Sequence, residues 1–160
     1  MLYFFIAAIV VAIDQGTKWF VVKYMTLGES IHVLGNFLYL TSHRNRGAAF
    51  GILQDQRWFF IVITLVIIIG IVYYLIKLKN EKKGLSWSLA LILGGAVGNF
   101  IDRLLTGEVV DFIDVKITIG QFFYDYPIFN VADSALVIGV AILFIDTLRD
   151  SLTEMKHKKG

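Results

Sequence analysis

Two aspartates stand in apolar stretches of the sequence where a carboxylate is unusual. Asp111 follows two valines in "VVDF", and Asp133 lies in "FNVADS", just before the apolar run Ala135 to Ile145. Other common catalytic groups are missing, because the chain has no cysteine and no GxSxG motif. Metal-binding spacing is also missing among the three histidines, His32, His43 and His157. Carboxylates are therefore the reactive groups left, and we expect neither a metal nor another cofactor.

Two carboxylates that lie close together can hydrolyse a peptide bond without a covalent intermediate. Because they cannot both ionise easily, one keeps a proton while the other acts as a general base on water. The protonated partner donates a hydrogen bond to the scissile carbonyl. A helix N-terminus would favour Asp133 as the anion, and apolar neighbours would favour Asp111 as the acid, although coupled carboxylates titrate as a pair.

The composition places these aspartates in an integral membrane protein. Of the 160 residues, 57% are hydrophobic and only 18% are charged, against roughly 25% charged in soluble domains. Four stretches are apolar enough for a membrane span of about 20 residues, and we expect helices at about 2–22, 58–76, 85–105 and 128–148. We predict a single membrane domain over 1–160, all-α in its transmembrane part. The first stretch lacks the features of a cleaved signal peptide, so we expect it to be retained.

Basic residues predict the orientation of the four spans. Lysines are concentrated between the second and third spans in "KLKNEKKG", and further basic residues follow the fourth span, namely Arg149, Lys156, Lys158 and Lys159. By the positive-inside rule, these segments and both termini face the cytoplasm. The connections at about 23–57 and 106–127 then face outwards. The first contains "NFLYLTSHRN", whose alternation predicts a strand, so we expect a small extracytoplasmic β-sheet.

Polar residues from five separate segments are predicted to meet at the outer edge of the membrane. A charge within a span costs roughly 2.5 to 3.5 kcal/mol on insertion scales, so each one suggests a function. The predicted helices and outer connections bring a group of polar residues to nearly one depth: Asp14, Asn45, Asn99, Asp102, Arg103, Asp111 and Asp133. This convergence predicts a functional site near the outer leaflet.

Structural explanations compete with a catalytic one at several of these positions. Asn130 and Asp133 are spaced as a helix cap with an acidic first turn, which would stabilise the start of the fourth helix without any catalysis. Arg103 could extend to the membrane interface. Asp14 and Lys18 could form a self-neutralising i, i+4 pair.

Two further patterns concern packing and the choice between neighbouring aspartates. Gly94 and Gly98 have the small-xxx-small spacing that permits close helix contact. In "GEVVDFID", the apolar flanks indicate a partly buried strand, on which alternation places Asp111 and Asp114 on opposite faces. We favour Asp111 over Asp114 as the functional residue.

Five short motifs occur in order along essentially the whole chain. They are "DQGTK" at 14–18, "NRGAAFG" at 45–51, "GNFIDR" at 98–103, "VVDF" at 109–112 and "FNVADS" at 129–134. Each motif alone is weak, but together they resemble the signature of the bacterial lipoprotein signal peptidases, or type II signal peptidases. The resemblance implies an intramembrane aspartic endopeptidase that removes signal peptides from diacylglyceryl-modified prolipoproteins. Such an enzyme would cut just before the lipidated cysteine.

The resemblance also implies which residues take part. Asp111 and Asp133 match the catalytic dyad of that family, and the supporting positions match Asp14, Lys18, Asn45, Gly47, Asn99, Asp102, Arg103, Asn130 and Ala132. It further implies an outer β-cradle and inhibition by the cyclic peptide globomycin. Expected partners are therefore prolipoproteins, membrane lipids and globomycin-type inhibitors, and no basic patch indicates nucleic acid. We expect aromatic residues of the outer sheet, such as Phe37 and Tyr39, to help clamp the substrate at the membrane surface.

The main alternative is a four-helix membrane protein without enzymatic activity. Intramembrane Asp, Asn and Arg residues also line proton pathways and transporters, and they can hold an assembly scaffold together. A pathway needs polar groups on both sides of the membrane, yet the inner halves of the second, third and fourth spans stay apolar until Asp146. A scaffold does not require two carboxylates at one level. The sequence therefore favours the protease.

Overall fold

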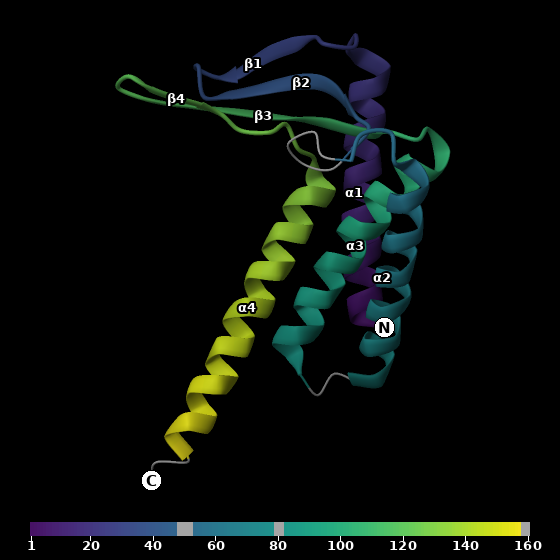
Figure 1. Cartoon of the computed structure of the whole chain (residues 1–160), viewed down its shortest axis with the longest axis vertical. Coiled ribbons are helices and arrows are strands. Elements are labelled where there is room, and N and C mark those ends of the chain that lie inside the picture. The colour runs from purple at the N-terminus through teal and green to yellow at the C-terminus, as the bar shows by residue number, and fades with distance from the viewer. Residues whose placement is uncertain (48–52, 79–81, 158–160) are drawn as a thin grey trace.

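The computed structural model describes residues 1–47, 53–78 and 82–157, which form four long helices and a four-stranded sheet (Figure 1). The helices are α1 (Leu2–Tyr24), α2 (Arg57–Leu78), α3 (Lys83–Leu105) and α4 (Val131–His157). Each is long and apolar enough to cross a membrane, which confirms the predicted four-span fold with a small sheet. Residues 48–51 of the "NRGAAFG" motif and residues 79–81 and 158–160 of the basic segments lie outside the described residues.

Helix α3 lies at the centre of the helix packing because it carries small residues where its neighbours approach. Half of its apolar span is buried, against 28% or less in each of the other three helices. A Cβ atom at Gly94 would come within 2.6 Å of Val10 Cβ in α1, and one at Gly98 within 3.2 Å of Ala132 Cβ in α4. The spacing of these glycines therefore serves close helix contact, as the sequence predicts.

The apolar side chains divide between a small core and the exposed faces of the helices. One core cluster joins α1, α2 and α3 and consists of Tyr3, Ala7, Ile71, Leu75, Ala90 and Leu93. Many large hydrophobic side chains remain exposed along α1, α2 and α4, among them Phe5, Ile9, Val62, Val66, Ile69, Val137 and Phe144. An exposed apolar surface of this extent suits a lipid environment.

The sheet lies across one end of the helices, and the start of α1 and the end of α4 lie at the other end (Figure 1). Its strands are antiparallel in the order β1 (Ser30–Leu34), β2 (Leu38–Asn45), β3 (Val109–Ile119) and β4 (Phe122–Asp125). Strand β2 lies within the predicted strand at 36–45, and β3 begins with "VVDF". Val110 and Phe112 of β3 pack against Val21 and Met25 at the end of α1, so Asp111 is held above the helix ends.

The predicted bounds of the fourth helix are wrong at both ends. We expected 128–148, but α4 spans Val131–His157, whereas the other helices end within two residues of their predicted bounds. At the start, Phe129 pairs with β3: its backbone nitrogen donates to Ile113 O at 3.0 Å, and its carbonyl accepts from Ile113 N at 2.8 Å. An apolar window cannot distinguish such strand-like residues from helix. At its end, α4 continues through a polar segment beyond the membrane span.

Candidate active site

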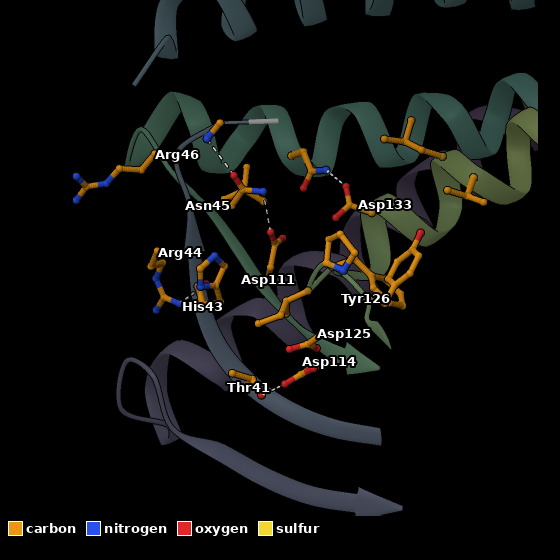
Figure 2. Close-up of a pocket in the computed structure, with 18 of the residues that line it drawn as sticks. Thr41, His43, Arg44, Asn45, Arg46, Asp111, Asp114, Asp125, Tyr126 and Asp133 are labelled. Carbon is orange, nitrogen blue, oxygen red and sulfur yellow. Dashed lines mark hydrogen bonds between the residues drawn. The ribbon is translucent and has the colours of Figure 1, made fainter. Parts of the chain in front are cut away.

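A cavity of about 1010 Å³ lies between the sheet and the adjoining ends of α3 and α4. Both Asp111 of β3 and Asp133 of α4 line it (Figure 2). The predicted convergence of polar residues is therefore present at the level where the sheet meets the helices. The cavity is large enough to accommodate an extended peptide segment.

Asp111 is almost fully buried, with 1% of its surface exposed. Asn130 Nδ2 donates to its Oδ1 at 2.7 Å, and Asn45 Nδ2 donates to its Oδ2 at 3.0 Å. Burial raises the pKa of Asp111 to about 7, and the nearby charge of Asp133 acts in the same direction, while the two amide hydrogen bonds oppose the rise. Asp111 therefore retains a proton up to nearly neutral pH.

Asp133 lies in the first turn of α4, where it exchanges hydrogen bonds with Asn130. The Asn130 backbone nitrogen donates to Asp133 Oδ2 at 3.2 Å, and the Asp133 backbone nitrogen donates to Asn130 Oδ1 at 2.9 Å. This is the reciprocal geometry of a capping box, which confirms the predicted helix cap. Asn99 Nδ2 donates to the other Asp133 oxygen at 2.7 Å. The cap thus also fixes the direction of the Asp133 carboxylate.

Three asparagines direct their amide groups at the two aspartates in the same way. In each, another donor occupies the side-chain oxygen, so the NH₂ group must face a carboxylate. Gly47 N donates to Asn45 Oδ1 at 2.9 Å, and Lys18 Nζ donates to Asn99 Oδ1 at 2.9 Å. In the third, Asn130, the side-chain oxygen Oδ1 accepts a hydrogen bond from the backbone nitrogen of Asp133. The carboxylates are therefore held by donors whose orientation is itself fixed.

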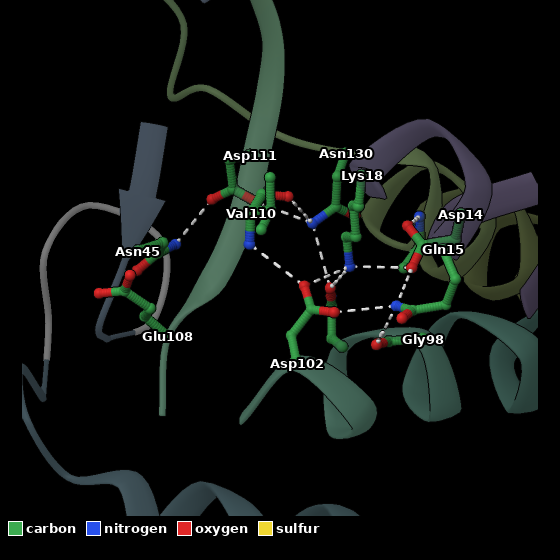
Figure 3. A network of polar contacts seen from close by, with 12 residues as sticks. Asp14, Gln15, Lys18, Asn45, Gly98, Asp102, Glu108, Val110, Asp111 and Asn130 are labelled. Carbon is green, nitrogen blue, oxygen red and sulfur yellow. Dashed lines mark hydrogen bonds and ion pairs between the residues drawn. The ribbon is translucent and has the colours of Figure 1, made fainter. Parts of the chain in front are cut away.

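Lys18 is buried, with 3% of its surface exposed, and all three of its ammonium protons have acceptors. Its Nζ lies 2.8 Å from Asp14 Oδ2, 2.9 Å from Asp102 Oδ2 and 2.9 Å from Asn99 Oδ1 (Figure 3). The predicted pair of Asp14 and Lys18 exists, but it is not self-contained. Lys18 therefore joins α1 to α3 through Asp102 and Asn99.

The two carboxylates that pair with Lys18 each hold the residue that precedes one of the cavity aspartates. Asp14 Oδ1 accepts from the backbone nitrogen of Ala132 at 2.9 Å, next to Asp133. Asp102 Oδ2 accepts from the backbone nitrogen of Val110 at 3.1 Å, next to Asp111 (Figure 3). The buried ion pairs therefore fix the backbone on both sides of the site.

Arg103 lies on the cavity wall, where its guanidinium group contacts two other residues of the protein. Its Nη2 donates to Gly47 O at 3.1 Å, and its Cζ lies 4.7 Å from the centre of the Phe60 ring. Because Gly47 N also donates to Asn45, Arg103 supports the turn that orients Asn45. In the described part of the chain, no group of three or more His, Cys, Asp or Glu side chains could hold a metal ion.

Most of the chain matches one protein family. The family model described as "Signal peptidase (SPase) II" matches residues 6–149. The chain belongs to the signal peptidase II family. It is 54% identical to a lipoprotein signal peptidase of Halalkalibacterium halodurans, over all of both chains. It is also 54% identical to one of Anoxybacillus flavithermus, over all of this chain and 90% of that one.

Solved structures agree with this membership. A bacterial membrane enzyme solved at 2.3 Å resolution matches with a TM-score of 0.85 and 47% identity, over 94% of this chain and 89% of the other. A second, solved at 1.9 Å, matches with a TM-score of 0.82 and 48% identity, over 93% and 94% of the two chains. The protein is therefore a signal peptidase II enzyme, which argues against a transport protein or a scaffold.

All residues that the sequence predicts for the site of this signal peptidase II lie in one polar network or on the cavity wall. Gln15 also belongs to the network but was not predicted. Its Nε2 lies 2.9 Å from Asp102 Oδ1, 3.1 Å from Gly98 O and 3.2 Å from Asp14 Oδ2. An amide within an apolar span, next to Asp14 in "DQGTK", was the signal that could have found it.

Asp114 of this signal peptidase II lies closer to the cavity than alternation along β3 implies. It is 3% exposed, Thr41 Oγ1 donates to its Oδ2 at 2.6 Å, and it lines the same cavity as Asp111. The start of β3 is buried on both faces, because Val109, Val110, Asp111 and Phe112 are all buried in succession. Asp111 and Asp114 are therefore both buried, although alternation places them on opposite faces of β3.

Proposed function

We propose that this signal peptidase II removes the signal peptide of prolipoproteins by aspartic catalysis, with Asp111 and Asp133 as the dyad. The peptide bond that it cuts precedes the diacylglyceryl-modified cysteine. A single observation carries the proposal: Asn130 donates hydrogen bonds to both carboxylates, one through its side chain at 2.7 Å and one through its backbone at 3.2 Å. Both carboxylates also line one cavity.

The environments of the two aspartates support different roles. Asp111 is buried, and its pKa is raised to about 7, so it supplies the proton. Asp133 is half-buried at the N-terminus of α4, where the helix dipole favours an anion, so it acts as the base. Asp133 takes a proton from water, the water oxygen attacks the scissile carbonyl carbon, and Asp111 donates a hydrogen bond to the carbonyl oxygen. The tetrahedral intermediate then collapses, and the proton held by Asp133 passes to the departing nitrogen of the cysteine.

An apolar groove beside Asp133 suits the signal peptide. Its volume is about 400 Å³, and it is lined by Val115, Tyr126, Phe129, Ser134, Val137 and Ile138 together with Asp133. A signal peptide is a short apolar segment with small residues at its cleavage site. Such a segment can lie along the exposed face of α4 and bring its end to the two carboxylates.

The membrane orientation follows from the distribution of basic residues. Lys82 and Lys83 at the start of α3, and Arg149 near the end of α4, belong to the end of the helices away from the sheet. By the positive-inside rule that end and both termini face the cytoplasm of a bacterial plasma membrane. The sheet and the cavity then lie at the outer leaflet, the depth at which a lipid-modified cysteine would be anchored.

Globomycin-type cyclic peptides should bind in the same cavity and compete with substrate. Their polar backbone would meet the polar wall around Asp111, and their apolar parts would fit the groove beside Asp133. Competitive inhibition by globomycin, in the cleavage reaction described next, tests this part of the proposal. Noncompetitive behaviour would place the inhibitor elsewhere.

Cleavage of a diacylglyceryl-modified prolipoprotein by the purified protein in detergent tests the proposal. Asp111→Asn and Asp133→Asn should each abolish turnover while the protein still folds, as shown by a cooperative melting transition. Asp146→Asn is the matched control, because it makes the same change in α4 at the end away from the sheet and should retain turnover. Mass spectrometry of the wild-type products should locate the cut just before the lipidated cysteine. Normal cleavage by either dyad variant, or a cut elsewhere, would refute the assignment.

A further inference from the structure

Asp114 is a second buried carboxylate in the cavity, and one of its oxygens has no hydrogen-bond partner in the described part of the chain. Its Oδ2 accepts a hydrogen bond from Thr41 Oγ1 at 2.6 Å and lies 3.7 Å from Lys116 Nζ. Its Oδ1 is buried and has no hydrogen-bond partner among the residues that the structure describes. Native proteins rarely leave a buried acceptor unpaired, because its desolvation is not compensated. This oxygen therefore indicates a position where a donor from a ligand binds.

The orientation of Asp114 is fixed by a chain of hydroxyl groups across the sheet. Thr41 has one hydroxyl proton and gives it to Asp114, so Ser30, whose Oγ lies 2.8 Å from Thr41 Oγ1, must donate to Thr41. The chain runs from β1 through β2 to β3 and holds Oδ2 in place. Figure 2 shows its last link, from Thr41 to Asp114. Oδ1 is thus the oxygen of Asp114 that is left without a donor among the described residues, in a side chain that lines the cavity.

The surroundings select a neutral N–H group as the donor. Lys116 already lies beside Asp114 and supplies a positive charge, so a cationic ligand gains little there. Asp114 also lies on the sheet side of the cavity. The apolar groove is lined by Ser134, Val137 and Ile138 of α4 and by Val115 of β3, the residue after Asp114. A substrate whose signal peptide follows α4 would therefore direct the chain beyond the cleavage site towards Asp114.

We propose that Asp114 Oδ1 accepts a hydrogen bond from a backbone amide in the first few residues of the mature lipoprotein, just beyond the lipidated cysteine. Asp114 is then a substrate-binding residue that positions the chain on the departing side of the scissile bond. The proposal rests on the proposed function, since it assumes the same substrate and the same cut.

Substrates with single ester bonds test this contact. In synthetic diacylglyceryl-modified peptides, the backbone N–H of the second, third or fourth mature residue is replaced by an ester oxygen, which removes the donor and keeps the shape. At one of these positions the wild-type kcat/KM should fall about tenfold, as expected for one hydrogen bond to a charged acceptor. Asp114→Ala should lose a similar factor with the all-amide peptide and show no further loss with that ester.

The matched control is Asp125→Asn, which changes a carboxylate of β4 that also lines the cavity but is exposed. It should keep the full sensitivity to the ester. Two results would overturn the proposal: wild type that cleaves all three esters as fast as the amide, or Asp114→Ala that remains as sensitive as wild type. The first needs no variant, so the test holds even if Asp114→Ala does not fold. Failure of the dyad itself would be seen separately, as normal cleavage by Asp111→Asn.

Discussion

Asp111 and Asp133 accept hydrogen bonds from the same residue, Asn130. The side chain of Asn130 lies 2.7 Å from Asp111, and its backbone nitrogen lies 3.2 Å from Asp133. Because Asn130 also caps α4, the start of this helix and the relative position of the two carboxylates depend on one residue. The sheet, which carries Asp111, and the helix, which carries Asp133, are thereby joined at the site.

Asn130→Ser separates these two tasks of Asn130. Serine is a good N-cap, so the start of α4 should keep its stability, but the donor to Asp111 is lost. We expect kcat to fall about ten- to a hundredfold, the size of a buried hydrogen bond to a charged group. Steady-state cleavage and thermal melting measure the two effects. Asn130→Ala, which removes the cap as well, should lose about 1 kcal/mol more stability; wild-type kcat in the serine variant would disprove the positioning role.

Lys18→Met should destabilise the protein strongly. Without the ammonium group, Asp14 and Asp102 remain buried and uncompensated, which we expect to lower the free energy of unfolding by about 3 to 5 kcal/mol. Urea unfolding in detergent measures the change. Adding Asp14→Asn and Asp102→Asn to Lys18→Met should recover part of the loss, because the like charges are removed. Wild-type stability in the single variant would show that the ion pairs are not structural.

The pH dependence of cleavage should follow the proton on Asp111. Since burial raises the pKa of Asp111 to about 7, the acid form is populated below that pH, and kcat/KM should fall about tenfold per pH unit above it. Asn45→Ala is a directional check: its hydrogen bond lowers the pKa of Asp111, so its removal should move the alkaline limb to higher pH. Activity that stays constant up to pH 9 in wild type would be inconsistent with Asp111 as the acid.

Gly98→Ala should damage both stability and activity through Asp14. The new methyl group would lie 2.5 Å from Asp14 Oδ2 and 3.2 Å from Ala132 Cβ, so α3, α1 or α4 must shift. We expect a loss of about 1 to 3 kcal/mol, typical of overpacking, and a lower kcat because Asp14 holds the residue before Asp133. Gly16→Ala in α1, where nothing lies within 4 Å of the new atom, is the control and should be neutral or slightly stabilising. Equal stability of both variants would contradict the packing argument.

The four helices could be predicted from the sequence because each contains an apolar run of span length. The start of α4 could not be predicted, since Phe129 is as apolar as the helix that follows. Only its backbone pairing with Ile113 of β3 shows that Phe129 is not part of the helix. Strands β2 and β3 were indicated by alternation and by the flanks of Asp111, whereas β1 and β4 carried no pattern that we recognised. Their residues are exposed on the sheet, so burial does not impose a periodicity on them.

The residues of the site were predicted from the sequence, but most of the contacts between them were not. The sequence paired Lys18 with Asp14, since they are one helical turn apart, and could not show that Lys18 also contacts Asp102 and Asn99 of α3. These partners are 81 or more positions away in the chain. Contacts of that kind depend on how α1 packs on α3, which a single sequence does not specify.

The most direct test of the dyad is the single-turnover rate of Asp111→Asn, Asp133→Asn and the double variant, each checked for folding by its melting temperature. Two carboxylates that act as one unit lose nearly all catalysis when either is removed. We therefore predict that each single variant loses at least about a thousandfold in rate, and that the double variant is no slower than the slower single variant. Modest single losses that multiply in the double variant would show that Asp111 and Asp133 act independently, and would contradict the dyad.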